Sequence, residues 1–380
     1  MMTTPEDQPV WIDKNDDFKR MVDDLARHSL LAVDTESNSL FAYKERVCLI
    51  QFSTGEVDYL IDPLALPDLS PLQEIFAGNS FEKIFHAAEY DLICLKRDFG
   101  FSFVNIFDTM VAGRILGKTS IGLASMLETY FDVTLDKRYQ RANWGQRPLS
   151  QAQLAYARLD TFYLIPLRSI LKSELQDSGR WRLAQEDFAR ACSVNVPAVE
   201  HTVDCWWRVT GGQELTSQQA AILNELCKYR DEQAKAVDLP PFKVMRNELM
   251  VDIAFACPQT LDELSEIHGM SPLMVERYGK GIMEAIRCGM RSRPPQKPTS
   301  RRPDDQFLSR LDVLRNWRKL TGQKLGVESD VILPREILED IAQSNPHKIE
   351  DLAVVMQPTP WRFERFGGQI LKILNPVEES

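Results

Sequence analysis

The apolar positions of the N-terminal half follow two different periods. Short apolar runs lie between residues 31 and 87, separated by turn-prone or polar stretches, and read LLAVDTE, VCLIQFST, VDYLIDP and KIFHAA. Runs of this length and composition are typical of β-strands. Apolar residues at helical spacing occur between and after them, at about 71–78, 89–98, 108–117, 121–131 and 150–165. This interleaving predicts an α/β fold in which helices pack on a central sheet.

The second half contains an internal repeat. Residues 223–286 match residues 311–374 at a constant offset of 88, without a gap. The matched pairs include Leu223 with Leu311, Tyr229 with Trp317, Arg230 with Arg318, Ile253 with Ile341 and Pro272 with Pro360. Each copy shows several short amphipathic helices. We therefore expect two small α-helical domains, at about 212–290 and 305–376.

Composition narrows the class of protein. The chain has 380 residues, 44% hydrophobic and 26% charged, which is typical of a soluble globular protein of two or three domains. The N-terminus lacks the apolar region of a signal peptide, and no apolar run approaches the length of a membrane span. Seven cysteines are scattered without a C-x-x-C pair, which argues against a disulfide framework and a zinc site. We expect a protein of the reducing cytoplasm.

The formal net charge of −10 is unevenly distributed. The segment 287–302, RCGMRSRPPQKPTSRR, carries six Lys or Arg residues and no acid. Its prolines disfavour regular structure. Two interpretations stay open: a solvated linker between the helical domains, or a linker that also contacts a phosphate backbone.

Two acids lie on the first predicted strand. Asp34 and Glu36 are two residues apart in LAVDTES, so the period of a strand places both carboxylates on the same side of the sheet. Two like charges on one face are costly unless a cation compensates them. Taken alone, however, such a pair is also common at a solvated strand end.

Three further candidates lie on helices. Asp91 falls in the first turn of the helix after KIFHAA, where an acid also complements the helix dipole. Tyr156 and Asp160 are four residues apart, on a helix that begins with a capping box of Ser150 and Gln153. They therefore share one face, one turn apart. Each feature alone is equally typical of an ordinary helix.

Two other segments resemble sites of chemistry. We interpret His86, at the end of a strand, as a structural histidine rather than a base. Residues 112–119, AGRILGKT, fit a relaxed phosphate-loop pattern that would suggest an NTPase. The bulky side chains at 114–116 stand where backbone amides should approach phosphate. We interpret this segment as a helix that is capped by Asp108 and ends at Gly117.

The order of the acids carries a family resemblance. A D-x-E in a first strand, an Asp after a later strand and a Y-x-x-x-D helix resemble the tyrosine-bearing branch of the DEDD exonuclease superfamily, and ribonuclease D most closely. The resemblance extends through DTMVAGRILG, LDKRYQRANWGQRPLS and both repeats, which resemble tandem HRDC domains. It implies a ribonuclease H-like exonuclease domain with a mixed sheet at 1–210, HRDC-like all-α domains at 211–290 and 305–380, and a basic linker at 291–304.

The resemblance also implies an activity. Carried over by position, the metal ligands are Asp34, Glu36, Asp91 and Asp160, and Asp34 is the best candidate to bridge two Mg²⁺ or Mn²⁺ ions. Tyr156 would orient the attacking water, because an unperturbed phenol is a poor base near neutral pH. The implied reaction is 3′→5′ hydrolysis of RNA to nucleoside 5′-monophosphates, with tRNA precursors or other structured RNA as substrate. The HRDC-like repeats imply accessory nucleic-acid binding.

Alternatives remain for both halves of the chain. The same carboxylates would serve a DNA 3′→5′ exonuclease equally well. A noncatalytic RNA-binding protein with a degenerate nuclease fold is disfavoured, since a binding module has no reason to retain four converging negative charges near phosphate. The helical repeats would also be consistent with packing or interaction modules.

Overall fold

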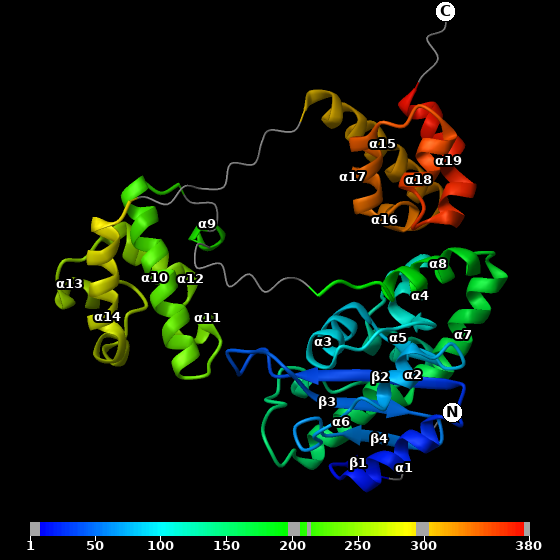
Figure 1. Ribbon diagram of the computed structural model, residues 1–380, viewed down its shortest axis with the longest axis horizontal. Helices are drawn as coiled ribbons and strands as arrows, with labels where there is room; N and C mark the ends of the chain where they lie inside the picture. Colours follow the sequence, from blue (N-terminus) through cyan, green and yellow to red (C-terminus); the bar gives the residue numbers. More distant parts are fainter. Residues whose placement is uncertain (1–7, 197–205, 211–213, 294–303, 376–380) are drawn as a thin grey trace, which may run out of the picture. The chain divides into compact units, whose positions relative to one another are not determined.

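The computed structural model describes residues 8–196, 206–210, 214–293 and 304–375 (Figure 1). These residues form two compact units. The first unit contains residues 8–37, 47–196 and 304–375, and the second contains 38–46, 206–210 and 214–293. The second helical repeat therefore belongs to the same unit as the α/β domain. Of the basic segment 287–302, residues 294–302 lie outside the described residues.

The α/β domain is built on a six-stranded sheet with the order β1-β4-β3-β2-β5-β6. β3 pairs antiparallel with β2 and with β4, and the other three pairings are parallel. The strands are β1 (Val10–Ile12), β2 (Leu30–Ser37), β3 (Val47–Ser53), β4 (Asp58–Ile61), β5 (Glu82–Phe85) and β6 (Ile106–Asp108). The mixed sheet confirms the predicted fold class. It also places β2, which carries Asp34 and Glu36, in the interior of the sheet.

Helices cover both faces of this sheet. They are α1 (Asn15–Leu25), α2 (Leu72–Ala77), α3 (Glu89–Phe99), α4 (Thr109–Ile115), α5 (Leu123–Phe131), α6 (Gln151–Phe162), α7 (Leu164–Asp177) and α8 (Trp181–Ala191). The alternation of side chains along β2 accounts for the two layers. Leu31 and Val33 join a core with α1, α2 and α3, whereas Ala32 joins a core with α4, α5, α7 and α8.

Sequence periodicity merged two helices into one and missed two short strands. The helix expected at 150–165 is two helices, because α6 ends at Phe162 and α7 begins at Leu164. Pro166 accounts for the break, since it has no amide hydrogen to continue the α6 ladder. The strands β1 and β6 were not predicted, because three residues are too few to show an alternating pattern.

The two helical repeats have the same sequence of helices. The first consists of α10 (Ser217–Ala236), α11 (Pro241–Val244), α12 (Asn247–Ala256), α13 (Leu261–Ser265) and α14 (Pro272–Arg291), preceded by the short α9 (Trp206–Val209). The second consists of α15 (Asp305–Leu325), α16 (Ser329–Ile332), α17 (Arg335–Ser344), α18 (Ile349–Val355) and α19 (Pro360–Leu374). Two small all-α domains were predicted, and the structure confirms them.

The offset of 88 also holds for individual contacts. The Nη1 of Arg230 donates to the carbonyl of Met245, and the Nη1 of Arg318 donates to that of Leu333.

Within the described residues, no helix combines the length and the apolar character that crossing a membrane requires.

Candidate active site

The first pair of acids lies on β2. Asp34 and Glu36 project to the same face, opposite Gln51 and Leu49 of β3 in the antiparallel register. Gln51 is fully buried, and its side-chain amide has no hydrogen-bond partner among the described residues. The two carboxylates therefore stand beside a neutral polar group rather than a cation.

The helix α6 brings the second pair to the same place. Its first turn is fixed by the predicted capping box, in which the amide of Gln153 donates to the Ser150 hydroxyl at 3.3 Å. Tyr156 and Asp160 lie one turn apart, and the phenol donates a hydrogen bond to the Asp160 carboxylate. α6 packs across β2, β3 and β4, so this face of the helix meets the acids of β2.

Three of the four predicted acids converge. One carboxylate oxygen from each of Asp34, Glu36 and Asp160 lies within 4.8 Å of the others. Asp91, in the first turn of α3, is held beside them by a hydrogen bond from the hydroxyl of Thr35. Thr35 was not recognised as a site residue from the sequence, where it was only the middle residue of D-x-E.

Burial raises the pKa of all four acids, and repulsion from neighbouring carboxylates adds to it; for Asp91 that neighbour is Asp108. Desolvation is the largest cause in each case. The pKa values of Asp91 and Asp160 rise to about 7, and those of Asp34 and Glu36 lie well above their ordinary range. For Asp34, the charges of the other three acids add to the effect of burial.

The donor set fits a divalent cation. Among the described residues, the main influences on these four pKa values are burial, other carboxylates and hydrogen bonds, and no Lys or Arg is among them. Several partly buried carboxylates without a basic partner are the oxygen ligands that Mg²⁺ and Mn²⁺ prefer. The charge of a bound cation would remove the repulsion that raises these pKa values.

Asp34, Glu36 and Asp160 line a cavity of about 400 Å³, and Asp91 is not among its lining residues. Its other walls come from α5, from His86 and from the segment before α6, and the lining residues are Asp34, Thr35, Glu36, His86, Gly122, Leu123, Ala124, Ser125, Leu135, Gln140, Tyr156 and Asp160. Gln140 is exposed at the rim. The cavity therefore joins the acid cluster to solvent.

Comparison with known proteins identifies the family to which this chain belongs. A family of 3′-5′ exonuclease domains matches residues 9–176, and HRDC domains match residues 219–286 and 307–374, again 88 residues apart. Ribonuclease D of Pseudomonas paraeruginosa is 30% identical over 382 residues, which cover 98% of this chain and 99% of that protein. The chain belongs to the ribonuclease D family.

Two further relatives bear on the activity. The crystal structure of Escherichia coli RNase D, described as an exoribonuclease involved in structured RNA processing, matches with a TM-score of 0.68 and 26% identity over 97% of this chain and 99% of that one. The exosome complex exonuclease RRP6 of Saccharomyces cerevisiae is 31% identical over 75% of this chain, but the match covers only 41% of its own length. This member of the ribonuclease D family is a 3′→5′ exoribonuclease that depends on divalent metal ions, which confirms the predicted reaction class.

In this ribonuclease D-family chain, the segment 139–147 before α6, called the aromatic segment below, packs against Tyr156. The ring centroids of Trp144 and Tyr139 lie 6.1 Å and 6.2 Å from that of Tyr156. The segment is fastened by Arg147, whose guanidinium binds both oxygens of Asp62 at 2.7 Å. Its Nη2 also donates to the carbonyl of Cys48 at 2.6 Å. The sequence showed this segment as part of the family resemblance but indicated no role for its residues.

A second support holds Asp91. The carboxylate of Asp108 accepts hydrogen bonds from four backbone amides, those of Ala87, Ala88, Met110 and Val111. It thereby joins the start of α3 to the start of α4. Ala87 has a φ of +62°, which is unfavourable for a residue with a Cβ, so its turn depends on such outside contacts. The position of Asp91, four residues later, therefore rests on Asp108.

His86 has a structural partner. Its Nδ1 lies 2.9 Å from the Thr109 hydroxyl, which itself donates to the carbonyl of Phe85. The hydroxyl therefore accepts from His86, which places the proton on Nδ1. Burial lowers the pKa of His86, against the opposing charge of Asp108. These contacts agree with a neutral histidine that fixes the end of β5.

The phosphate-loop pattern lies on a helix. β6 ends at Asp108 and α4 begins at Thr109, so no loop separates the strand from the helix. Asp108 caps α4, which ends at Ile115, and Gly117 follows with a φ of +76°. These features agree with the helical interpretation of residues 108–117.

Proposed function

We propose that Asp34, Glu36, Asp91 and Asp160 together hold two divalent metal ions, Mg²⁺ or Mn²⁺, for hydrolysis of the terminal phosphodiester of RNA. The observation that carries this proposal is the convergence of three carboxylates within 4.8 Å, with raised pKa values and no basic partner among the described residues. A pair of bound ions supplies water activation and stabilises charge on the phosphate and the leaving oxygen.

The four acids differ in their surroundings. The charges of all three other acids raise the pKa of Asp34, which supports its assignment as the ligand shared by both ions. Asp91 is oriented by Thr35, and Asp160 by the phenol of Tyr156. A carboxylate that is already held by a hydrogen bond loses less side-chain entropy when it binds a cation.

Tyr156 is proposed to position the attacking water. Burial and three neighbouring acids raise the pKa of its phenol, so the group stays protonated at neutral pH and cannot act as the base. The protonated hydroxyl already donates to Asp160, and its remaining lone pairs can accept from a water in the cavity.

The preferred substrate is proposed to be the 3′ end of structured RNA, such as a tRNA precursor, with release of nucleoside 5′-monophosphates. The solved E. coli relative is described as acting in structured RNA processing, which supports this choice. The same acids would accept DNA, so a matched RNA and DNA oligomer pair tests the preference for ribose.

The decisive experiment uses one RNA labelled at either end. With Mg²⁺ or Mn²⁺, we expect label at the 3′ end to appear at once as mononucleotide, while 5′-labelled RNA shortens stepwise. EDTA and Asp34→Asn should abolish both signals, and the exposed acid variant Glu128→Gln should retain them. Early release of the 5′ label would refute the polarity, and full activity of Asp34→Asn would refute the metal site. Absence of metal-dependent cleavage would restore the noncatalytic RNA-binding alternative.

A precursor tests the finer substrate proposal. The chain should trim a tRNA precursor with a short 3′ trailer and slow down at the folded body. The same trailer as a free oligomer is the control. Trimming of the free oligomer alone would refute a role in structured RNA.

The first helical domain is proposed to add RNA-binding surface. Four basic residues of α14 are exposed and recur at helical spacing, namely Arg277, Lys280, Arg287 and Arg291. Arg287 is paired with Glu284 on the same helix, so Arg277, Lys280 and Arg291 are proposed to contact phosphate, with little sequence preference. Lys280→Ala should weaken RNA binding and reduce its salt dependence; unchanged binding at low salt would contradict the role.

We likewise propose the limits of the domains. The exonuclease domain would span 1–210, the two helical domains 211–290 and 305–380, and the linker 291–304. We also propose a cytoplasmic location, which the six free cysteines of the described residues support.

A further inference from the structure

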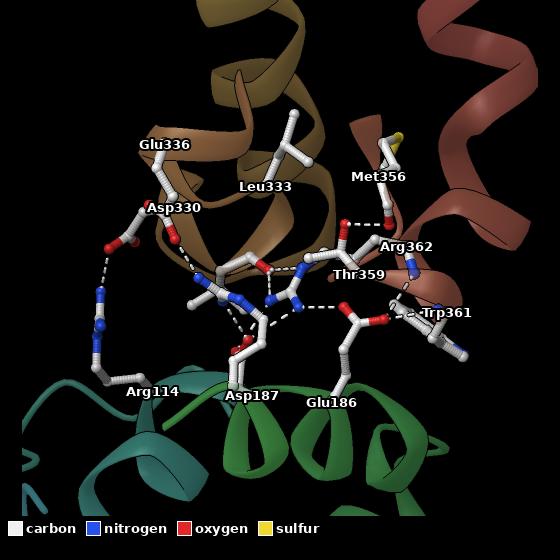
Figure 2. Close-up of polar contacts among 12 residues, drawn as sticks. Arg114, Glu186, Asp187, Asp330, Leu333, Glu336, Met356, Thr359, Trp361 and Arg362 are labelled. Carbon is white, nitrogen blue, oxygen red and sulfur yellow. Dashed lines mark hydrogen bonds and ion pairs between the residues drawn. The ribbon is translucent and has the colours of Figure 1, made fainter. Parts of the chain in front are cut away.

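The last helix of the second repeat is capped by a residue from another domain. The amides of Trp361 and Arg362, in the first turn of α19, donate to one carboxylate oxygen of Glu186 on α8, at 2.6 Å and 3.3 Å (Figure 2). The N-terminal amides of a helix have no partner within the helix and favour an anion. The exonuclease domain therefore completes a helix of the second helical domain.

Arg362 adds a buried ionic contact to the same place. Its side chain is fully buried, and its guanidinium binds Glu186, Asp187 and the carbonyl of Val331 (Figure 2). These five hydrogen bonds use every N–H of the group. A guanidinium buried in this way is costly unless all its partners are present. The buried Arg362 guanidinium is therefore stable only while the second helical domain contacts the exonuclease domain.

The first repeat lacks this arrangement at the equivalent positions. Its helix α14 is capped by its own Ser271, whose hydroxyl accepts from the amide of Met274 at 3.3 Å. At the offset of 88, Met274 corresponds to Arg362 and Ser271 to Thr359. The Thr359 hydroxyl donates to the carbonyl of Met356 and does not cap its helix. The second repeat has thus replaced an internal cap with an external one.

The phosphate-loop-like segment 112–119 forms the other half of the contact. Arg114 binds Glu328 at 2.9 Å and Asp330 at 2.5 Å. A Cβ at position 117 would lie 2.1 Å from the carbonyl oxygen of Gly326, so only glycine allows this approach. Arg114 and Gly117 of this segment therefore serve the docking of the second helical domain, whereas Lys118 pairs with Glu174 of the exonuclease domain itself.

Apolar contacts continue between these polar ones. Val331 is 3% exposed and belongs to the same hydrophobic cluster as the α4, α7 and α8 core, and Trp361 packs against that cluster. The interface thus combines buried apolar contacts with paired charges, Arg362 with Glu186 and Asp187 and Arg114 with Glu328 and Asp330.

We propose that the surface formed by α4 and α8 is a docking site specific for the second helical domain, which it holds as a fixed part of the catalytic body. Selectivity between the repeats comes from the first turn of the last helix. An arginine and an uncapped turn fit Glu186 and Asp187, whereas a methionine and a self-capped turn do not. The two HRDC domains therefore have different roles, and the second is bound by its own exonuclease domain.

The test uses the full chain with a specific protease site inserted between residues 293 and 304. After cleavage, the C-terminal fragment should co-elute with the rest of the chain in size-exclusion chromatography at micromolar concentration. Arg362→Met, which copies the first repeat, should weaken this association by at least about 100-fold and separate the fragments. Separation of the unsubstituted fragments would overturn the proposal, as would co-elution of the Arg362→Met fragments.

Two further variants serve as controls. Arg182→Ala removes an ion pair with Glu364 at the same interface, in which the two side chains are 64% and 60% exposed, and it should leave the fragments associated. If Arg362→Met lowers the helical circular dichroism of the uncut chain, Gly117→Ala takes its place, because it changes only the exonuclease side. Fragments of Gly117→Ala that stay together would then refute the docking site.

Discussion

The repulsion among the active-site acids predicts that removing one of them stabilises the metal-free protein. Asp160 is 8% exposed, and its pKa rises from 3.8 to about 7 in the folded state. A difference of about 3 units corresponds to at most about 4 kcal/mol, shared with the acids that interact with it. Asp160→Asn keeps the shape of the side chain without its charge. In EDTA at pH 8, we expect this variant to unfold later than the unsubstituted protein.

The sign of the pH dependence follows from the raised pKa. The unfolded carboxyl ionises near pH 4 and the folded one near pH 7, so between them only the folded state holds the proton. Stability of the metal-free protein therefore falls as pH rises from about 4 to 7, and Asn removes this part of the fall. The gain from Asp160→Asn should be small at pH 4.5 and approach its maximum above pH 7.

Thermal or urea unfolding in EDTA at several pH values measures this gain. One kcal/mol shifts the midpoint of a domain of this size by roughly 2–4 °C, so the largest shift at pH 8 is on the order of 10 °C. Mn²⁺ should stabilise the unsubstituted protein and not the variant. Asp58→Asn is the control, because that buried acid is paired with Arg158 and its loss should destabilise. A variant that is less stable at pH 8, or equally stabilised at every pH, would refute the reasoning.

Three further substitutions test the surroundings of the acids. Tyr156→Phe should lower the turnover number by on the order of 10²-fold with RNA affinity nearly unchanged, and parallel loss of both in binding and single-turnover assays would contradict a water-positioning role. Asp108→Asn should raise the Mn²⁺ concentration for half-maximal activity about 10-fold or more, because an amide cannot accept from four backbone donors that hold the turn before Asp91. The cap variant Ser271→Ala, far along the chain from the acids, should not change that metal concentration. Arg147→Lys should lower stability by about 1–3 kcal/mol in urea unfolding, since lysine cannot bind a carboxylate with two parallel bonds; an unchanged midpoint would show that the aromatic segment is held otherwise.

The shared faces of the acid pairs could be predicted from the sequence because they depend on local periods. The period of two on β2 and the one-turn spacing on α6 fix which side chains share a face before any tertiary contact forms. Asp91 depends instead on a strained turn at Ala87 and on Asp108, which lies 17 residues later in the chain. No local pattern indicates that pairing. It follows from β5 and β6 being neighbours in the sheet.

The docking surface was invisible in the sequence for a related reason. Glu186, Asp187 and Arg362 are charged residues on amphipathic helices, and a periodicity argument assigns such residues to solvent. The assignment is correct for each domain taken alone, because the three charges would face water if the domains separated. It fails only when two such faces meet and satisfy each other. The repeat does contain a sign of this contact, in the replacement of Met274 by Arg362 at otherwise equivalent helices. A position that is apolar in one copy and charged in the other indicates that the copies face different surroundings, and here the charged copy is buried against the catalytic domain.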